Sequence, residues 1–228
     1  FLKNQREIQE RTKKDVKTVF ATEEPQFGET LENLCKKIHI NYEIITFDVN
    51  KPKDAKNRIW NIVSARNSIR EYFLKSNAEY LVFMDADMIF DPEIVNKLLE
   101  LAQEGYDVVY NGYLDRNGHG INITGFGGTL IKRWVMENII FKCKEKRGQV
   151  IDEAVFFELD LFRIRAKVFR GFIVYNEHHG ETVYVCHPRD LTFNEKIRNS
   201  QYFRIPVHII SVILCYDILR KLKNILKS

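Results

Sequence analysis

Two aspartates, Asp85 and Asp87, directly follow a run of apolar residues and are the clearest chemical feature of the chain. The run at residues 80–84 predicts a strand that is buried on both faces, as in a parallel sheet. Open α/β sheets bind ligands at the carboxyl ends of their strands, where these carboxylates stand. In an extended chain residues i and i+2 point the same way, so both can reach one hard cation. The alternative is a pair of solvated loop acids.

A second candidate is Arg66, which lies in a long helix expected from Asp54, its cap, to about residue 76. The apolar side chains of this segment recur at helical spacing and form one stripe: Ile59, Ile62, Val63, Ile69 and Phe73. Arg66 falls near the middle of this stripe, and an unpaired buried charge is costly. We expect the guanidinium to lie near Asp85 or a ligand phosphate. The alternative is an arginine that extends past the edge of the stripe into solvent.

Helices and strands alternate along the first half of the chain. Expected helices cover residues 1–14, 29–38, 54–76 and 92–104, and expected strands cover residues 16–21, 42–47, 80–84 and 107–111. Asp91 and Pro92 predict the start of the fourth helix, as N-cap and first helical residue, and Gly105 predicts its end. This order is typical of an α/β fold with a mostly parallel central sheet flanked by helices.

The second half is less regular. Five glycines within residues 115–128 predict a flexible connection, which leaves open an acceptor lid or simple tight turns. We then expect a strand at 127–132, a helix at 134–141, a charged loop at 142–149, a helix capped by Asp152, and strands from 172 to 185. We divide the chain into one domain, residues 1–200, and a helical appendage, residues 201–228.

Composition narrows the class of protein. The net charge of +4 suits an anionic ligand or a membrane surface and gives no argument for nucleic acid. The four cysteines form no Cys-x-x-Cys pair, which is typical of reduced thiols in a cytoplasmic protein. Residues 205–228 join an apolar run to a basic end, and we expect them to pack on the domain or form a homodimer. The alternative is peripheral contact with the cytoplasmic face of a membrane.

Taken together, these motifs resemble the GT-A glycosyltransferases, especially the family-2 group. Residues 64–67 and the strand before Asp87 resemble the family's Arg-Asn helix and Asp-x-Asp strand. In that family the Asp-x-Asp motif binds a divalent metal and the diphosphate of a nucleotide sugar. The resemblance implies that Asp87 is a metal ligand, that Asp85 contacts the metal or the ribose, and that Arg66 supports the diphosphate.

Other segments extend the resemblance over about residues 15–190. Glu23 and Glu24 replace the aspartates of the family's acidic turn, which implies contact with the donor's base. Residues 125–133 resemble the Gly-rich acceptor-side segment and the strand after it. Asp152 and Glu153 match the family's acidic pair, in which one acid is the catalytic base. Asp152 is the first choice and Glu153 the second, with a plain helix N-cap as the alternative for Asp152.

The resemblance also implies a cofactor. Mn²⁺ or Mg²⁺ suits a site with oxygen ligands. Many GT-A enzymes take a further metal ligand from a late histidine, and His187 is the nearest match. His178 and His179 compete with it, and a turn histidine without a metal is the alternative for each.

We therefore expect a metal-dependent, inverting glycosyltransferase of the hexosyltransferase type. It would move a sugar from a nucleotide-sugar donor to a glycan, lipid or protein. One alternative is a phosphatase of the haloacid-dehalogenase type with Asp85 as nucleophile. The 84 residues before Asp85, and Met88 and Ile89 after Asp87, argue against it. Another alternative is a non-catalytic nucleotide- or carbohydrate-binding domain of the same fold.

One expectation concerns a missing element. Family members open with a strand that cradles the nucleotide base, and their acidic turn follows the second strand. In this chain the acidic turn follows residues 16–21, the first strand expected. We therefore expect the usual first strand to be lacking and its place, between residues 16–21 and 80–84, to be vacant. The alternative is a divergent sheet that closes without it.

Overall fold

The computed structural model describes residues 1–53, 55–114, 121–122, 125–146, 149–172, 176–178 and 181–183. All of them lie within one unit, Phe1–Arg189. The expected boundary at residue 200 and the segment 205–228 lie outside the described residues. The division into a domain and an appendage therefore stays a prediction.

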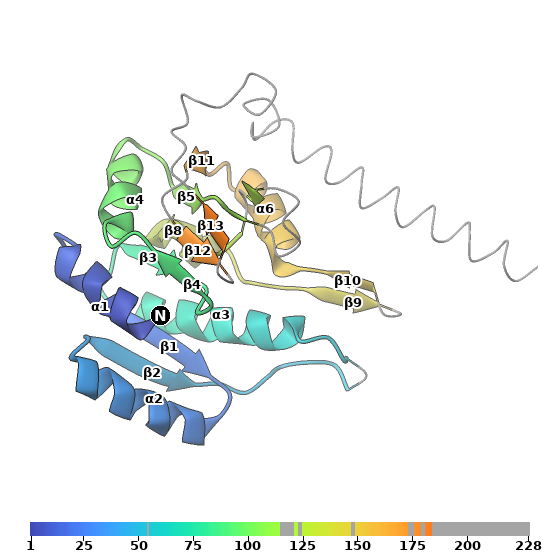
Figure 1. Ribbon diagram of the computed structural model, residues 1–228. Coiled ribbons are helices and arrows are strands. Elements are labelled where there is room, and N and C mark those ends of the chain that lie inside the picture. The colour runs from blue at the N-terminus through green and yellow to red at the C-terminus, as the bar shows by residue number, and fades with distance from the viewer. Residues whose placement is uncertain are drawn as a thin grey trace, which may run out of the picture. The chain divides into compact units, whose positions relative to one another are not determined.

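The described elements alternate as expected in the first half of the chain (Figure 1). The helices are α1 (Leu2–Arg11), α2 (Pro25–Ile38), α3 (Ile59–Lys75), α4 (Ile94–Gln103), α5 (Arg133–Asn138) and α6 (Glu153–Arg163). The strands are β1 (Thr18–Thr22), β2 (Tyr42–Thr46), β3 (Tyr80–Phe83), β4 (Met88–Phe90), β5 (Val108–Asn111), β6 (Tyr113–Leu114), β7 (Ile121–Asn122), β8 (Thr129–Lys132), β9 (Lys144–Lys146), β10 (Gln149–Ile151), β11 (Val168–Phe172), β12 (Asn176–His178) and β13 (Glu181–Val183). The α/β class is confirmed.

The central sheet is four-stranded in the part that the structure describes, with the order β11-β5-β8-β3. Strand β11 is parallel to β5, whereas β8 runs antiparallel to both of its neighbours, β5 and β3. Because β3 and β5 both oppose β8, they point the same way and their carboxyl ends lie at one edge. The sheet is therefore mixed, with β8 as the strand that departs from the parallel order.

Strands β1 and β3 belong to different sheets. Among the described residues, β1 pairs in parallel with β2, and β3 pairs with β8. Direct pairing of β1 with β3, which would contradict a vacant strand position, is not found there. Helix α3 packs against β1 (Figure 1). It also contributes Val63 and Phe73 to the core around Phe83. The absence of the usual first strand stays a prediction.

Strand β3 contributes to a core on each of its faces. Leu81 and Phe83 pack in a cluster with side chains from α3, α5 and α6. Tyr80 and Val82 pack in a second cluster with α4 and with Ile8 of α1. Successive side chains of a strand point to opposite faces, so both faces of β3 are covered, but only Phe83 is fully buried and the other three residues are half-buried.

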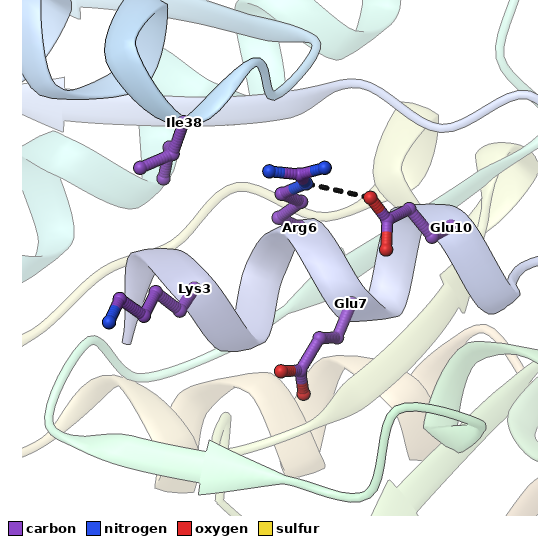
Figure 2. A pocket seen from close by; sticks show the side chains of 5 residues that line it. All are labelled: Lys3, Arg6, Glu7, Glu10 and Ile38. Carbon is purple, nitrogen blue, oxygen red and sulfur yellow. Dashed lines mark hydrogen bonds and ion pairs between the residues drawn. The ribbon is translucent and has the colours of Figure 1, made fainter.

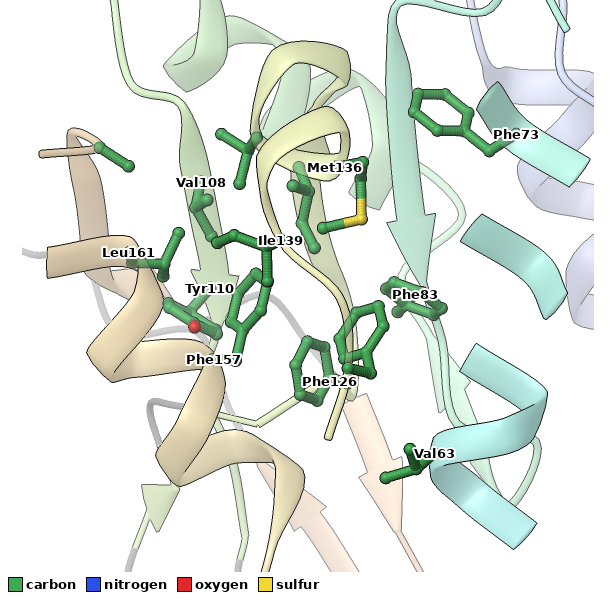
Figure 3. Packing of buried hydrophobic residues seen from close by; sticks show 14 residues of the cluster. Val63, Phe73, Phe83, Val108, Tyr110, Phe126, Met136, Ile139, Phe157 and Leu161 are labelled. Carbon is green, nitrogen blue, oxygen red and sulfur yellow. The ribbon is translucent and has the colours of Figure 1, made fainter. Parts of the chain in front are cut away.

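Four phenylalanine rings form the centre of the first cluster, close to the end of β3 (Figure 3). Phe83, Phe126, Phe141 and Phe157 contact one another with ring centroids 5.1–5.6 Å apart, four pairs edge-on and one stacked. Such aromatic pairs stabilise a fold by about 0.5–1.5 kcal/mol each beyond the area they bury. They join the Gly-rich segment to α6.

Three expectations on element boundaries are wrong. Helix α2 begins at Pro25 rather than residue 29, because proline suits the first helical position. Helix α4 begins at Ile94 rather than Pro92. The Asp91 side chain accepts a hydrogen bond from the Glu93 amide at 2.8 Å, and its carbonyl accepts one from Ile94 at 2.9 Å, so a turn precedes the helix. Helix α3 begins at Ile59, and Asp54 lies outside the described residues.

The expected charged loop at residues 142–149 is also wrong. Strands β9 and β10 pair antiparallel there and form a hairpin that leads directly to Asp152. The sequence also gave no sign of β4, which pairs antiparallel with β12. Both strands of the hairpin and β4 are three residues long, too short for a periodic pattern to reveal.

Candidate active site

Asp85 and Asp87 lie in a turn that connects β3 to β4. The Met88 amide donates a hydrogen bond to the Asp85 carbonyl at 3.2 Å, so the backbone reverses here and is not extended as expected. The Asp85 side chain is 39% exposed, and Asp87 is exposed. Both carboxylates therefore stand at the carboxyl end of β3, within reach of a ligand from solvent.

Gly128 links the ends of β3 and β5 next to this turn through backbone hydrogen bonds. Its amide donates to the Phe83 carbonyl at 2.9 Å, and its carbonyl accepts from the Asn111 amide at 3.1 Å. Its φ of +85° is in the left-handed region, and a Cβ atom would meet side chains of Asn111, Ile94 and Phe90 at 3.2 Å. A tight turn with close backbone approach is confirmed at this glycine, whereas residues 115–120, with Gly118 and Gly120, lie outside the described residues.

Arg66 projects from α3 towards the Asp85 turn. Its Nη2 lies 3.8 Å from Asp85 Oδ1, as its place on the apolar stripe predicts. Its Nη1 donates a hydrogen bond to Glu153 Oε1, a contact that the sequence did not indicate. The guanidinium carbon lies 4.0 Å from the centroid of the Phe126 ring, a favourable cation–π distance. Arg66 therefore brings the Asp-x-Asp turn and the acidic pair into one site.

The two acids of the pair have different surroundings. Asp152 is exposed, and its Oδ1 accepts a hydrogen bond from the Val155 amide at 3.1 Å, which makes it the N-cap of α6. The Glu153 side chain is 8% exposed and faces Arg66. Its Oε2 has no hydrogen-bond partner among the described residues. The capping expectation for Asp152 is confirmed, and Glu153 alone of the pair contacts Arg66 in the described part of the chain.

The β9–β10 hairpin fastens this region to the start of α3. The Glu145 carboxylate accepts hydrogen bonds from Trp60 Nε1 at 3.0 Å and from the Asn57 amide at 3.3 Å. Desolvation of Glu145 opposes its charged form, but these hydrogen bonds outweigh it and lower the pKa of Glu145. Glu145 thus ties the segment before Glu153 to the helix that carries Arg66.

Cys143 lies beside the same acids. Burial, as the larger cause, and the negative charges of Glu153 and Glu145 together raise the pKa of Cys143 to about 11. Cys35 is a buried free thiol, as expected for a reduced core cysteine. Cys186 and Cys215 lie outside the described residues.

Glu23 and Glu24 follow β1 and are exposed. The Asn61 side chain on α3 donates hydrogen bonds to both carboxylate oxygens of Glu23, at 2.7 and 2.9 Å. Glu24 precedes α2 as its N-cap residue without a capping hydrogen bond from its side chain. Glu23 is thereby held to the helix that carries Arg66, and the expected role of both glutamates in base binding stays a prediction.

The expected histidine ligand lies outside the described residues, as does His179. His178 ends β12, and its backbone is in register with Met88, directly after Asp87. Where the structure describes the chain, no three His, Cys, Asp or Glu side chains gather closely enough to hold a metal ion. Asp85 and Asp87 alone therefore remain as described candidates for metal ligands.

A pocket on the outer side of α1 is separate from these residues. Figure 2 shows that it is lined by Lys3, Arg6, Glu7, Glu10 and Ile38. Arg6 and Glu10 form an exposed ion pair at 2.7 Å across one helical turn. Such a pair adds little stability, and the pocket contains none of the candidate site residues. No helix in the described part of the chain has the length and apolar character needed to cross a membrane.

One family model overlaps the candidate site. Residues 64–152 match the family model described as Glycosyl transferase family 2. No curated protein matches the chain. Among solved structures, the crystal structure of A197 from STIV is similar, with 18% sequence identity and a TM-score of 0.46, over 75% of this chain and 94% of that one.

The family match contains Arg66, the Asp85 and Asp87 turn, and Asp152, and it ends directly before Glu153. These are the segments that Arg66 and the β9–β10 hairpin bring together. Glycosyl transfer is the general activity that this match supports. Over residues 64–152 the chain is thus similar to the family-2 glycosyltransferases, and its mixed α/β architecture is consistent with the GT-A type.

Proposed function

We propose that this protein is a metal-dependent, inverting glycosyltransferase of the hexosyltransferase type. It transfers a sugar from a nucleotide-sugar donor to a hydroxyl group of a glycan, lipid or protein acceptor. The observation that carries the proposal is the position of Arg66, between Asp85 and Glu153. One side chain thereby lies between the turn that carries two exposed carboxylates and a buried acid, an arrangement that suits the transfer of a phosphate-activated sugar.

The turn after β3 fits a divalent cation. Asp85 and Asp87 supply only oxygen ligands and are open to solvent, which is the chemistry that Mg²⁺ and Mn²⁺ prefer. Two carboxylates leave several coordination positions of a cation open, and substrate phosphates can fill them. A cation bound there would neutralise the charge that develops on the departing diphosphate. His187 would be a further ligand in this proposal, with His178 and His179 as its competitors.

Glu153 is the catalytic base in this proposal. Its buried Oε2 makes no hydrogen bond to the described residues. A carboxylate that turns towards the acceptor hydroxyl could accept its proton. The hydroxyl oxygen forms a bond to the anomeric carbon while the bond from that carbon to the diphosphate oxygen breaks. The proton passes to Glu153, and the nucleoside diphosphate leaves with the bonding electrons. Attack opposite the leaving group inverts the anomeric configuration.

Asp152, the first choice from the sequence, has a supporting role in this scheme. As N-cap it accepts the Val155 amide and so fixes the start of α6, where Glu153 is the first residue. Glu23 and Glu24 would contact the base or ribose of the donor from the end of β1, with Glu23 oriented by Asn61.

Donor turnover is the test of this function. The full chain is incubated with UDP-, GDP- and ADP-sugars, with and without Mn²⁺, and release of the nucleoside diphosphate and of free sugar is measured. Release that depends on Mn²⁺ supports the proposal. Release of inorganic phosphate from phosphomonoesters, without turnover of any nucleotide sugar, would instead support the phosphatase. Binding of nucleotide without turnover, in the presence of simple glycan acceptors, would support the non-catalytic domain.

A further inference from the structure

We infer that Arg66 is a positioning residue that responds to the donor, an inference that rests on the function proposed above. In the free protein Arg66 holds the carboxylate of Glu153. When the donor binds, its diphosphate takes over Arg66 and releases Glu153 to accept the acceptor's proton. Donor binding would therefore precede activation of the base.

The first observation is that one guanidinium faces two carboxylates. Arg66 Nη1 donates a hydrogen bond to Glu153 Oε1, whereas Nη2 lies 3.8 Å from Asp85 Oδ1, beyond hydrogen-bond distance. In the structure the cation is therefore held more closely by Glu153 than by Asp85. The Glu153 oxygen that it engages is not available to a hydroxyl group.

The second observation is the difference in exposure along this row of charges. The side chains of Arg66 and Glu153 are 13% and 8% exposed, whereas Asp85 is 39% exposed. The row is closed on the Glu153 side and open on the Asp85 side. A diphosphate bound through a cation at Asp85 would meet the guanidinium from its open side.

The third observation is the support beneath the guanidinium. Phe126 lies 4.0 Å from it and Phe83 lies 5.9 Å from it. The face of an aromatic ring attracts a cation but forms no directed ion pair with it. The two rings therefore favour the position of the guanidinium plane without favouring Glu153 over a phosphate.

Competition for Arg66 follows from these contacts. A phosphate oxygen and a carboxylate oxygen both form charge-assisted hydrogen bonds with a guanidinium. Because Glu153 already holds Arg66, the donor must break that pair before it gains its own contact. The pair therefore lowers donor affinity, and removal of the Glu153 charge should raise it. Loss of the repulsion between Glu153 and the diphosphate would also tighten binding, but it would do so without Arg66 as well, so the Arg66→Ala background separates the two causes.

The experiment is isothermal titration calorimetry of the full chain with UDP, GDP and ADP, each with Mn²⁺. The wild-type protein is compared with Glu153→Gln, Arg66→Ala and the double variant. Glu158→Gln is the matched control, because Glu158 lies on the same helix and is paired with the buried Arg170 instead. Thermal unfolding of each variant establishes that it is folded, and the uncharged Glu153→Ala replaces Glu153→Gln if the latter does not fold.

We expect Glu153→Gln to bind the preferred nucleoside diphosphate about tenfold more tightly than the wild type, the effect of one charge-assisted hydrogen bond. In the Arg66→Ala background the same substitution should change nothing, and Glu158→Gln should bind as the wild type does. Equal or weaker binding by a folded Glu153→Gln protein would overturn the inference and leave the proposed function intact. Failure of every folded variant to bind any of the three nucleotides would contradict the proposed function itself.

Discussion

Asp152 and Glu153 are neighbours in the sequence but lie in opposite environments, one exposed at the start of α6 and the other buried against Arg66. The backbone direction at a helix start explains the difference. The N-cap side chain turns back to the free amides of the first turn, whereas the first helical residue projects to the side. Here that side is the core that contains Phe126 and Arg66.

The two acids should therefore respond differently to substitution. We predict that Glu153→Gln lowers the rate of sugar transfer by roughly 10²–10⁴-fold, the usual contribution of a general base. Asp152→Asn should retain most of the activity, because asparagine caps helices as well as aspartate does. Initial rates at saturating donor, together with thermal unfolding, measure both effects. An inactive but folded Asp152→Asn protein beside an active Glu153→Gln protein would return the base to Asp152.

The pKa of Cys143 depends on the negative charge of Glu153 and can be used to detect it. Its pKa of about 11, against an ordinary value of 9.0, means that the folded thiol keeps its proton between those two pH values. The unfolded thiol loses its proton there, so this group's contribution to the free energy of unfolding falls as the pH rises from about 9 to about 11.

Only the thiolate reacts with iodoacetamide, so we predict slow alkylation of Cys143 in the folded chain, with a midpoint near pH 11. Glu153→Gln removes one nearby negative charge and should move the midpoint to lower pH. Peptide mass spectrometry after timed alkylation locates the modified cysteine. Cys35 is the internal control, because it is buried in α2, far from Glu153 in the sequence. A midpoint that does not move in Glu153→Gln would contradict the charge coupling.

We predict that any side chain at Gly128 lowers the stability of the fold. Alanine there would combine a φ of +85° with contacts of 3.2 Å to three side chains, and strain of this kind costs about 1–3 kcal/mol. Gly105→Ala is the control, because φ is +102° but no atom lies within 4 Å of the added Cβ. Chemical denaturation should show a larger loss of stability for Gly128→Ala. Equal losses would mean that the surrounding side chains adjust at no cost.

Glu145 is predicted to hold the start of α3 in place. Glu145→Ala removes the acceptor of the Trp60 indole and the Asn57 amide, so both should exchange their hydrogens with solvent faster. Hydrogen exchange measured by NMR tests this, with the exposed Glu100→Ala on α4 as control. Unchanged protection at Trp60 would show that the hairpin does not fasten the helix.

Much of this site follows from local patterns in the sequence. The apolar run before Asp85, the stripe that includes Arg66 and the capping position of Asp152 each depend on a few neighbouring residues, and all three are found as expected. Gly105 likewise ends α4 with a positive φ of 102°. Such features are predictable because strand burial, helical spacing and capping act over one or two turns of chain.

The features that the sequence did not reveal depend on distant partners. Strand β4 exists through its pairing with β12, and nothing in the three residues of β4 indicates that partner. The first strand of the hairpin consists of charged residues, as a surface loop often does. Its contacts with Trp60 and Asn57, through Glu145, come from a distant part of the sequence. The Arg66 contact with Glu153 likewise joins two helices that no local signal connects.

The most direct test of the account is donor turnover by wild-type protein and by Asp87→Asn, titrated with Mn²⁺. The control is Glu104→Gln, which removes an exposed acid at the end of α4. The account predicts that release of nucleoside diphosphate rises with Mn²⁺ in the wild type and in Glu104→Gln, and is lost in a folded Asp87→Asn protein at every Mn²⁺ concentration. Full turnover by Asp87→Asn at saturating Mn²⁺ would contradict the role given to the Asp-x-Asp turn.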